Sequence, residues 1–267
     1  MNMKIGFIGP GKMAKAIVNG IISSKFLNSE NVYIYGRSEN SVSHFVDLGC
    51  TACFDLGEMH SECDIVFLCV KPQNLNEITK LILEQVSNNV LYVSVLAGVT
   101  SEKIENLLNK KLKIIRAMPN TPLLIAEGAT AVSRTDNVSD EELDCVLKIF
   151  ASSGEVAVIK EEQMNAIICV NGSTPALVYR FAKDIKEYAS IYGVDEEISK
   201  KLFAQTLIGC AKMITQSGLD EEELIKMVTS KGGTTFEALK TLDENSFDDI
   251  LKKSLTACYN RAVELGK

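Results

Sequence analysis

Two glycines near the start of the chain have the spacing of a phosphate-binding turn. Residues 4–8 (KIGFI) are apolar and end in Gly9-Pro10-Gly11, after which a run with helical periodicity begins. In Gly9-x-Gly11-x-x-Ala14, the first glycine allows a sharp turn, the second lets backbone approach a pyrophosphate, and the small third residue lets the helix pack on the strand. The helix N-terminus then faces the phosphates with unpaired N–H groups and a positive dipole end. The pattern favours a dinucleotide site over a plain structural turn.

Pro10 limits the donors that this turn can offer. Because proline has no N–H, we expect the backbone contacts to the phosphates to come from Gly11, Lys12 and Met13. Proline also fixes φ, so it stiffens the loop at the end of the strand.

The residues after the second predicted strand bear on the choice of dinucleotide. Residues 32–35 (VYIY) are β-branched and aromatic, and Gly36, Arg37 and Ser38 follow them. A fold that prefers NAD usually places an acid here for the ribose 2′-OH, whereas Arg37 and Ser38 suit a 2′-phosphate. NADPH is therefore favoured, with NADH as the alternative. The plainer explanation of Arg37 is a solvated charge at a strand end.

Three later apolar runs predict further strands of the same sheet. Residues 64–70, 91–96 and 113–117 are continuously apolar or nearly so, as expected of parallel strands covered on both faces. Alternation with helical runs predicts a doubly wound parallel sheet, in which ligands lie at the carboxyl ends of the strands. The loops at those ends are residues 71–72, 97–100 and 118–122.

The character of the chain changes near residue 160. Residues 156–159 form the last clear strand, and only helical periodicity follows. We expect a Rossmann-type nucleotide-binding domain over residues 1–160 and an all-α domain over residues 161–267. The apolar side chains of the helical domain exceed what one small bundle buries, so part of its surface is expected to pack on another subunit.

A second ligand-binding turn is predicted between two of these helices. Residues 230–235 read SKGGTT, in which two glycines open a helix whose first turn carries two hydroxyls, so adjacent N–H groups can converge on an anion. Thr234-x-x-Glu237 is also a capping box, which explains the same residues structurally. On the pattern alone the two interpretations are equally favoured, and they can coexist because a capped helix still has free N–H groups ahead of it.

Composition and charge exclude several classes of protein. Hydrophobic residues are 46% and charged residues 24%, an ordinary globular balance. A net charge of −7 without a basic block argues against nucleic acid as a partner. No apolar run approaches the ~20 residues of a membrane span, and no signal segment is seen, so we expect a cytoplasmic protein. Only Cys50 and Cys53 have a chelating spacing, which favours reduced thiols over a metal site.

Taken together, these motifs resemble those of the pyrroline-5-carboxylate reductase family, and the resemblance covers nearly the whole chain. It rests on five stretches, of which the last is the most family-specific: GFIGPGKMA (6–14), VKP (70–72), AGVT (97–100), RAMPNTP (116–122) and GGTTFEA (232–238). The resemblance implies NAD(P)H-dependent reduction of a cyclic imine carboxylate, 1-pyrroline-5-carboxylate, to proline. It also implies a helical domain that dimerises by interleaving helices, with dimers assembling further, often into decamers.

The resemblance also implies site residues. Those for the cofactor are Gly9, Pro10, Gly11, Lys12, Met13, Arg37, Ser38, Val70, Lys71, Pro72, Val95, Leu96, Ala97 and Asn120. Those for the substrate are Asn171, Gly232, Gly233, Thr234 and Thr235. Because a protonated C=N carbon is already electrophilic, little acid–base work is needed, and Thr235 is expected to supply a hydroxyl near the ring nitrogen.

The chain departs from the family pattern mainly in its helical domain, and this keeps alternatives open. Residues 171–177 read NGSTPAL where the family has SGSGPAY, and Lys231 replaces a proline. A reductase of a different cyclic imine would explain these changes. A β-hydroxyacid dehydrogenase would need a lysine soon after Gly172, but the next is Lys183. The third alternative is a non-catalytic regulator that binds NADPH.

Overall fold

The computed structural model describes residues 3–267, whose contacts divide into two compact units. Unit 1 comprises the residues up to Pro175 together with Cys258–Lys267, and unit 2 comprises Ala176–Ala257. Residues 161–175 therefore pack with the sheet, although only helical structure follows residue 160. The functional division of the chain at residue 160 stays a prediction.

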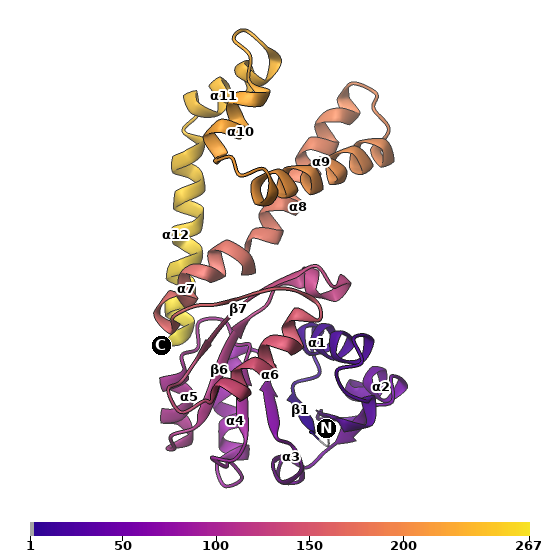
Figure 1. Ribbon diagram of the computed structural model, residues 1–267, viewed down its shortest axis with the longest axis vertical. Coiled ribbons are helices and arrows are strands. Elements are labelled where there is room, and N and C mark those ends of the chain that lie inside the picture. The colour runs from indigo at the N-terminus through magenta and orange to yellow at the C-terminus, as the bar shows by residue number, and fades with distance from the viewer. Residues whose placement is uncertain (1–2) are drawn as a thin grey trace. The chain divides into compact units, whose positions relative to one another are not determined.

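Unit 1 is built on one eight-stranded sheet with the order β3-β2-β1-β4-β5-β6-β7-β8 (Figure 1). Strands β1 to β6 are parallel, as predicted. The strands are β1 (Ile5–Ile8), β2 (Val32–Tyr35), β3 (Thr51–Cys53), β4 (Ile65–Leu68), β5 (Leu91–Ser94), β6 (Lys113–Met118), β7 (Gly128–Arg134) and β8 (Gly154–Val158).

Strand β7 departs from the parallel arrangement, because it runs antiparallel to β6. The link between them, residues 119–127, is shorter than the dozen or more residues that a parallel crossover needs. Strand β8 is then parallel to β7, and α6 (Asp140–Ala151) makes the crossover between them. The predicted capping box opens α6: Glu142 N–H donates to Ser139 Oγ, and Ser139 N–H donates to Glu142 Oε2.

Apolar side chains that alternate along the central strands form the two main cores of unit 1. Phe7 and Phe67 stack at 4.6 Å between ring centroids in the core that α1 (Lys12–Ser23) and α6 share. Ile8 and Leu68 belong to the opposite core, together with side chains of α3 (Leu56–Glu62), α4 (Leu75–Ile82) and α5 (Ser101–Leu108). This alternation is the period of 2 expected of a strand buried on both faces.

A third cluster joins segments from three distant parts of the chain. Met118 of β6 and Ala131 of β7 pack with Met164 and Ile168, which precede the helical region, and with Ala262 near the end of α12 (Phe247–Gly266). Residues 258–266 of α12 and Lys267 after it thereby complete unit 1.

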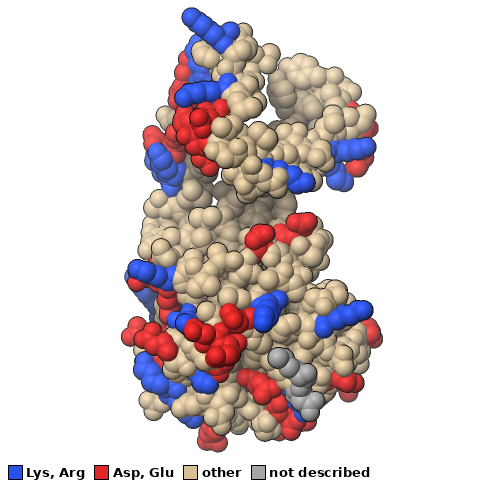
Figure 2. All heavy atoms as spheres, in the orientation of Figure 1, with Lys and Arg blue, Asp and Glu red and all other residues tan. Residues whose placement is uncertain are grey.

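Unit 2 has almost no core of its own. It contains α9 (Glu196–Gln216), α10 (Glu221–Val228), α11 (Thr234–Glu244), most of α8 (Thr174–Ile191) and the first half of α12. Among residues 176–257, all of which the structure describes, only Ser199 is buried. Large apolar side chains such as Tyr188, Leu202 and Ile208 are exposed. In Figure 2 uncharged residues cover much of the visible surface of unit 2, which indicates that this surface packs on other chains.

A substitution at Gly154 tests how closely the backbones of β7 and β8 must approach. Its φ is +146°, and an added Cβ would lie 2.0 Å from the carbonyl oxygen of Gly128. We expect Gly154→Ala to lower the free energy of unfolding by about 3 kcal/mol or more, since backbone strain and a clash with backbone add. Gly49→Ala is the control, because its φ is +86° but its Cβ meets only the movable Ser29 Oγ. It should cost about 1 kcal/mol in urea denaturation. Equal losses would show that the contact is not the cause.

Candidate functional site

An open groove of about 450 Å³ lies at the carboxyl ends of β1, β2 and β4. It brings together three loops that the sequence places at strand ends, residues 9–11, 36–41 and 69–74. Its lining residues include Gly9, Pro10, Gly11, Tyr35, Gly36, Arg37, Ser41, Val70, Lys71 and Asn74. Of these, Tyr35, Gly36, Ser41 and Asn74 are not among the predicted site residues.

The two glycines of the first turn differ in what requires them. Gly9 has φ +105°, and a Cβ there would lie 2.9 Å from backbone atoms of Cys69 and Val70, so no other residue fits. At Gly11 the nearest atom to an added Cβ is Cys69 O at 4.0 Å, so the protein itself leaves open space. An absent side chain beside an open groove is what close approach of a ligand requires.

The donors in the turn are fewer than predicted. Gly11 N–H already donates to Gly9 O at 2.8 Å, so it does not point freely at a ligand. Gly11 is the N-cap of α1 and offers no side-chain cap. The N–H groups of Lys12 and Met13, in the first helical turn, have no partner one turn earlier and remain the donors for an anion.

The positive charge of the groove comes from two side chains. Arg37 and Lys71 are both exposed, and Arg37 Nη2 lies 2.7 Å from Glu77 Oε2. An ion pair between exposed side chains is worth about 0–1 kcal/mol, so an anion with more charge can displace Glu77. Ser38 precedes α2 (Glu39–Asp47) as its N-cap, and Ser41 Oγ donates to Ser38 O at 2.6 Å. The groove therefore has Arg37 and the Ser41 hydroxyl on the side of β2 and Lys71 on the side of β4.

Cys69 is the one thiol that lines the groove among the described residues. Burial raises the pKa of the Cys69 thiol well above its ordinary value, so at neutral pH it stays protonated. A thiol in that state is a poor nucleophile and metal ligand. Residues 3–267 contain no group of three or more His, Cys, Asp or Glu side chains placed to hold a metal.

Asn120 and Asn171 form a network of amide hydrogen bonds beneath the end of β6. Asn171 Nδ2 donates to Met118 O at 2.8 Å and to Ala129 O at 2.9 Å. Asn120 Oδ1 accepts from Ala129 N–H at 2.9 Å, and Asn120 Nδ2 donates to Asn171 O at 3.3 Å. Asn120 is thus committed to backbone, and its predicted cofactor contact stays a prediction.

Asn171 lies in a π-helical turn, Ile168–Gly172, just before α8. Such turns are rare and occur often at functional sites. Its Oδ1 is buried without a hydrogen-bond partner, although the amide nitrogen makes two bonds. One acceptor therefore remains for a donor outside the chain, which is consistent with, but does not test, the predicted substrate role.

The turn before α11 differs from the capping box that the sequence allows. Gly233 is the N-cap of α11, and no side chain caps it, so the Thr234-x-x-Glu237 box is not formed. Thr234 instead starts the helix itself, one position too late to cap it. Gly232 has φ +73°, which favours glycine. The structural alternative for the two threonines is therefore wrong, and their hydroxyls make no hydrogen bond among residues 3–267.

The remaining predicted cofactor residues lie beyond the groove. Pro72 opens a short 3-10 helix, Pro72–Asn74. Leu96 is buried, whereas Val95 and Ala97 are half-buried in the loop after β5. Because β5 neighbours β4 in the sheet, this loop stands next along the same edge.

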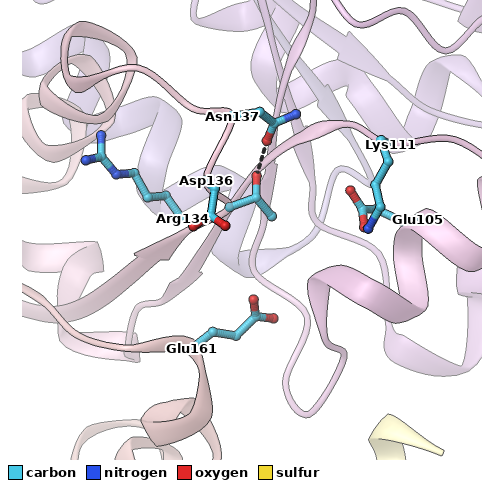
Figure 3. A pocket seen from close by; sticks show the side chains of 7 residues that line it. Glu105, Lys111, Arg134, Asp136, Asn137 and Glu161 are labelled. Atoms are coloured by element: carbon cyan, nitrogen blue, oxygen red, sulfur yellow. Dashed lines mark hydrogen bonds and ion pairs between the residues drawn. The ribbon is translucent and has the colours of Figure 1, made fainter.

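Another hollow, of about 540 Å³, lies elsewhere in unit 1. Figure 3 shows charged side chains around it, including Glu105, Lys111, Arg134 and Glu161. These charges are already paired: Lys111 with Glu105 at 2.6 Å, Arg134 with Asp140 at 2.6 Å, and Glu161 with Arg116 at 3.1 Å. Asp136, which also lines the hollow, makes no ion pair with the described residues, so the unpaired charge here is negative and does not suit an anionic ligand.

Comparison with known proteins identifies the family of the chain. A model described as pyrroline-5-carboxylate reductase dimerisation matches residues 161–265, and one described as NADP oxidoreductase, coenzyme F420-dependent, matches residues 4–98. A pyrroline-5-carboxylate reductase of Escherichia coli strain K12 is 36% identical over 268 residues, with 100% of both chains covered. The chain belongs to the pyrroline-5-carboxylate reductase family. A Bacillus subtilis member is 34% identical over 266 residues, covering 98% of this chain and 95% of its own.

Solved structures extend the likeness to the whole fold. The Plasmodium falciparum pyrroline carboxylate reductase, solved with NADP bound, is similar with a TM-score of 0.92 and 29% identity over 100% of this chain and 99% of its own. A pyrroline-5-carboxylate reductase from Coxiella burnetii has a TM-score of 0.88 and 31% identity, with 100% of both chains covered. A prephenate dehydrogenase from Aquifex aeolicus, at 17% identity, shares the fold alone. Across residues 3–267, none of the helices combines the length and the apolar character needed to cross a membrane.

Removing the Asn171 amide should show how much its hydrogen bonds contribute to the free energy of unfolding. Asn171→Ala leaves the carbonyls of Met118 and Ala129 without their donor, and we expect a loss of about 2 kcal/mol in unfolding free energy. Asn165→Ala is the matched control in the same stretch, because the Asn165 side chain has no such bonds. Urea denaturation at one protein concentration compares them. A loss no larger than that of the control would contradict the structural role.

Proposed function

We propose that this protein reduces 1-pyrroline-5-carboxylate to L-proline with NADPH, as an oxidoreductase acting on a C=N group. The observation that carries the proposal is the pair of Thr234 and Thr235 hydroxyls, which belong to the most family-specific motif and which no helix cap uses. Full-length likeness to reductases of this name supports it. The proposal is tested by incubating purified protein with NADPH and the imine and detecting proline as product.

The residues of the groove fit a dinucleotide with a 2′-phosphate. Lys12 and Met13 offer N–H groups at a helix N-terminus for the pyrophosphate, and Gly9 and Gly11 keep that approach free of side chains. Arg37 and Lys71 supply charge, and Ser38 a hydroxyl, at the end of the groove beside β2. The remaining predicted residues, Val95 to Ala97 and Asn120, would contact the other half of the cofactor.

The reaction requires little of the protein beyond placing the substrate against the cofactor. NADPH, when bound, supplies a hydride to the C=N carbon. The chain must hold the substrate carboxylate, orient the ring and exclude water. Gly233 N–H already donates to Ser230 O at 2.9 Å, so we assign the carboxylate to the N–H groups of Thr234 and Thr235 at the start of α11. We assign Thr235 Oγ1 to a position near the ring nitrogen. Asn171 Oδ1 is a further acceptor available for the ring N–H.

The helical region is the part of the chain through which we expect the protein to assemble. The dimerisation model that matches residues 161–265, and the exposed apolar side chains of unit 2, support assembly through the helical region. We propose a dimer, with further association into a decamer as the larger form, in the cytoplasm.

A reductase of another cyclic imine is the second candidate, and a specific observation favours it. Residues 171–177 depart from the family pattern, and Asn171 and Thr174 both belong to the altered π-helical turn and its junction with α8. A panel of cyclic imines that differ in ring size and carboxylate position, assayed with NADPH, distinguishes the two.

Cofactor choice should depend on Arg37. We expect Arg37→Asp to weaken NADPH binding by tenfold or more, because the new carboxylate repels the 2′-phosphate, while NADH binding changes by less than about threefold. Glu77→Gln is the control, since it frees Arg37 from its ion pair and should leave NADPH binding unchanged or tighter. Dissociation constants from fluorescence titration give both results. Equal affinity of the unaltered protein for NADPH and NADH would contradict the assignment.

The substrate turn is tested by a matched pair of threonines in α11. Thr235→Val should lower kcat/KM for the imine by tenfold or more, about 1.4 kcal/mol, with NADPH affinity unchanged. Thr241→Val is the control, because Thr241 lies on the same helix and bonds only to the Glu237 carbonyl. Unchanged kcat/KM in a folded Thr235→Val variant would place the substrate elsewhere.

A further inference from the structure

The loop after β5, residues 95–100, is held by residues far along the chain. Gly98 has φ +79°, and a Cβ added there would lie 2.2 Å from the carbonyl oxygen of Ala262 and 3.0 Å from Leu265 Cβ. A Cβ added to Gly266 would lie 2.5 Å from Gly98 O. The loop and the last turn of α12 therefore meet backbone to backbone, with a glycine on each side.

The other end of this loop is also fixed by hydrogen bonds to a residue far along the chain. Ser101 N–H, at the start of α5, donates to Glu161 Oε1 at 2.7 Å, and Arg116 Nη1 donates to the same oxygen at 3.1 Å. Arg116 is 3% exposed, and the Glu161 carboxylate offsets the cost of burying its charge. Burial lowers the pKa of Arg116, and the neighbouring Glu161 carboxylate opposes that shift. Little freedom is left to the residues between these anchors.

The order of the strands shows which part of a dinucleotide this loop would meet. The groove has Arg37 at the end of β2, the phosphate turn at the end of β1 and Lys71 at the end of β4. Neighbouring strands stand about 4.8 Å apart, and the order continues from β1 to β4 and then β5. A dinucleotide that starts at Arg37 and crosses the turn at Gly9 therefore extends its nicotinamide half towards residues 95–97.

We propose that the last turn of α12, Ala262–Gly266, is a positioning element that sets the place of loop 95–98 and, through it, of the nicotinamide ring. This rests on the proposed function only in taking the ligand to be NADPH. Hydride transfer requires the reacting carbons about 3–3.5 Å apart, so a displaced loop lowers the rate of the chemical step more than it weakens binding. The adenosine half, held by Arg37 and the Gly9 turn, is untouched by this contact.

The test is Gly266→Ala, which crowds Gly98 O. Alanine is a better helix former than glycine, so a loss of function would not come from a weaker helix. We expect kcat to fall tenfold or more and the Kd for NADPH to rise several-fold. The Kd for adenosine 2′,5′-bisphosphate, which lacks the nicotinamide half, should stay within twofold. Glu264→Ala in the same turn, whose exposed side chain pairs with Arg261, is the matched control and should change none of these.

A second variant ends the chain after Glu264 and so removes the contact of Gly266 with Gly98 instead of crowding it. It should also weaken NADPH binding several-fold and leave the Kd for the bisphosphate within twofold. Equal weakening of NADPH and the bisphosphate, or an unchanged kcat in Gly266→Ala, would overturn the proposal. The two dissociation constants are measured without the imine, so they can be compared even if the protein fails to reduce pyrroline-5-carboxylate. In that case the proposed function fails, and the positioning role of α12 is still decided by the two dissociation constants.

Discussion

The contact between Gly9 and the backbone of Cys69 and Val70 is the constraint on which the groove depends. Only a residue without a side chain lets the end of β1 lie against the end of β4 at φ +105°. That approach sets the direction in which α1 leaves the strand, and so where its unpaired N–H groups point. It also places Val70 and Lys71 opposite the turn, so that two loops distant in sequence share one groove.

Local charge, not net charge, makes this groove suitable for an anion. The chain carries −7 overall, and its field at a distance repels a phosphorylated ligand. Arg37 and Lys71, with the dipole of α1, reverse the sign over a few ångströms. Glu77 pairs with Arg37 at 2.7 Å and so holds the guanidinium at the groove until a phosphate replaces the carboxylate.

Most strand positions and the groove residues could be predicted because each depends on neighbours in sequence. The apolar runs and the turn at Gly9 are local signals, and the structure confirms the strands and brings Arg37 and Lys71 to the same groove. The antiparallel β7 depends on the length of one link, and the bond from Gly11 N–H to Gly9 O depends on dihedral angles, neither of which a pattern of residue types determines.

Features that depend on distant residues or on backbone dihedral angles were also missed or misjudged in the helical region. Thr234-x-x-Glu237 satisfies the pattern of a capping box, but the helix starts one residue earlier than that box requires. Asn171 and Glu161 act through partners 40 or more residues away, such as Met118 and Ser101. A charged residue, Arg116, inside an apolar strand was the one local sign that a buried partner had to exist.

Because unit 1 is discontinuous in sequence, its two parts are synthesised at different times. Residues 176–257 must be translated before α12 brings Ala262 and Gly266 against Gly98. At about 5–20 residues per second, the interval between synthesis of this loop and of its cover is on the order of ten seconds. Throughout it, Ala97, Met118 and Ala131 lack part of their apolar cover, so the nascent chain exposes an apolar surface of the kind that chaperones bind.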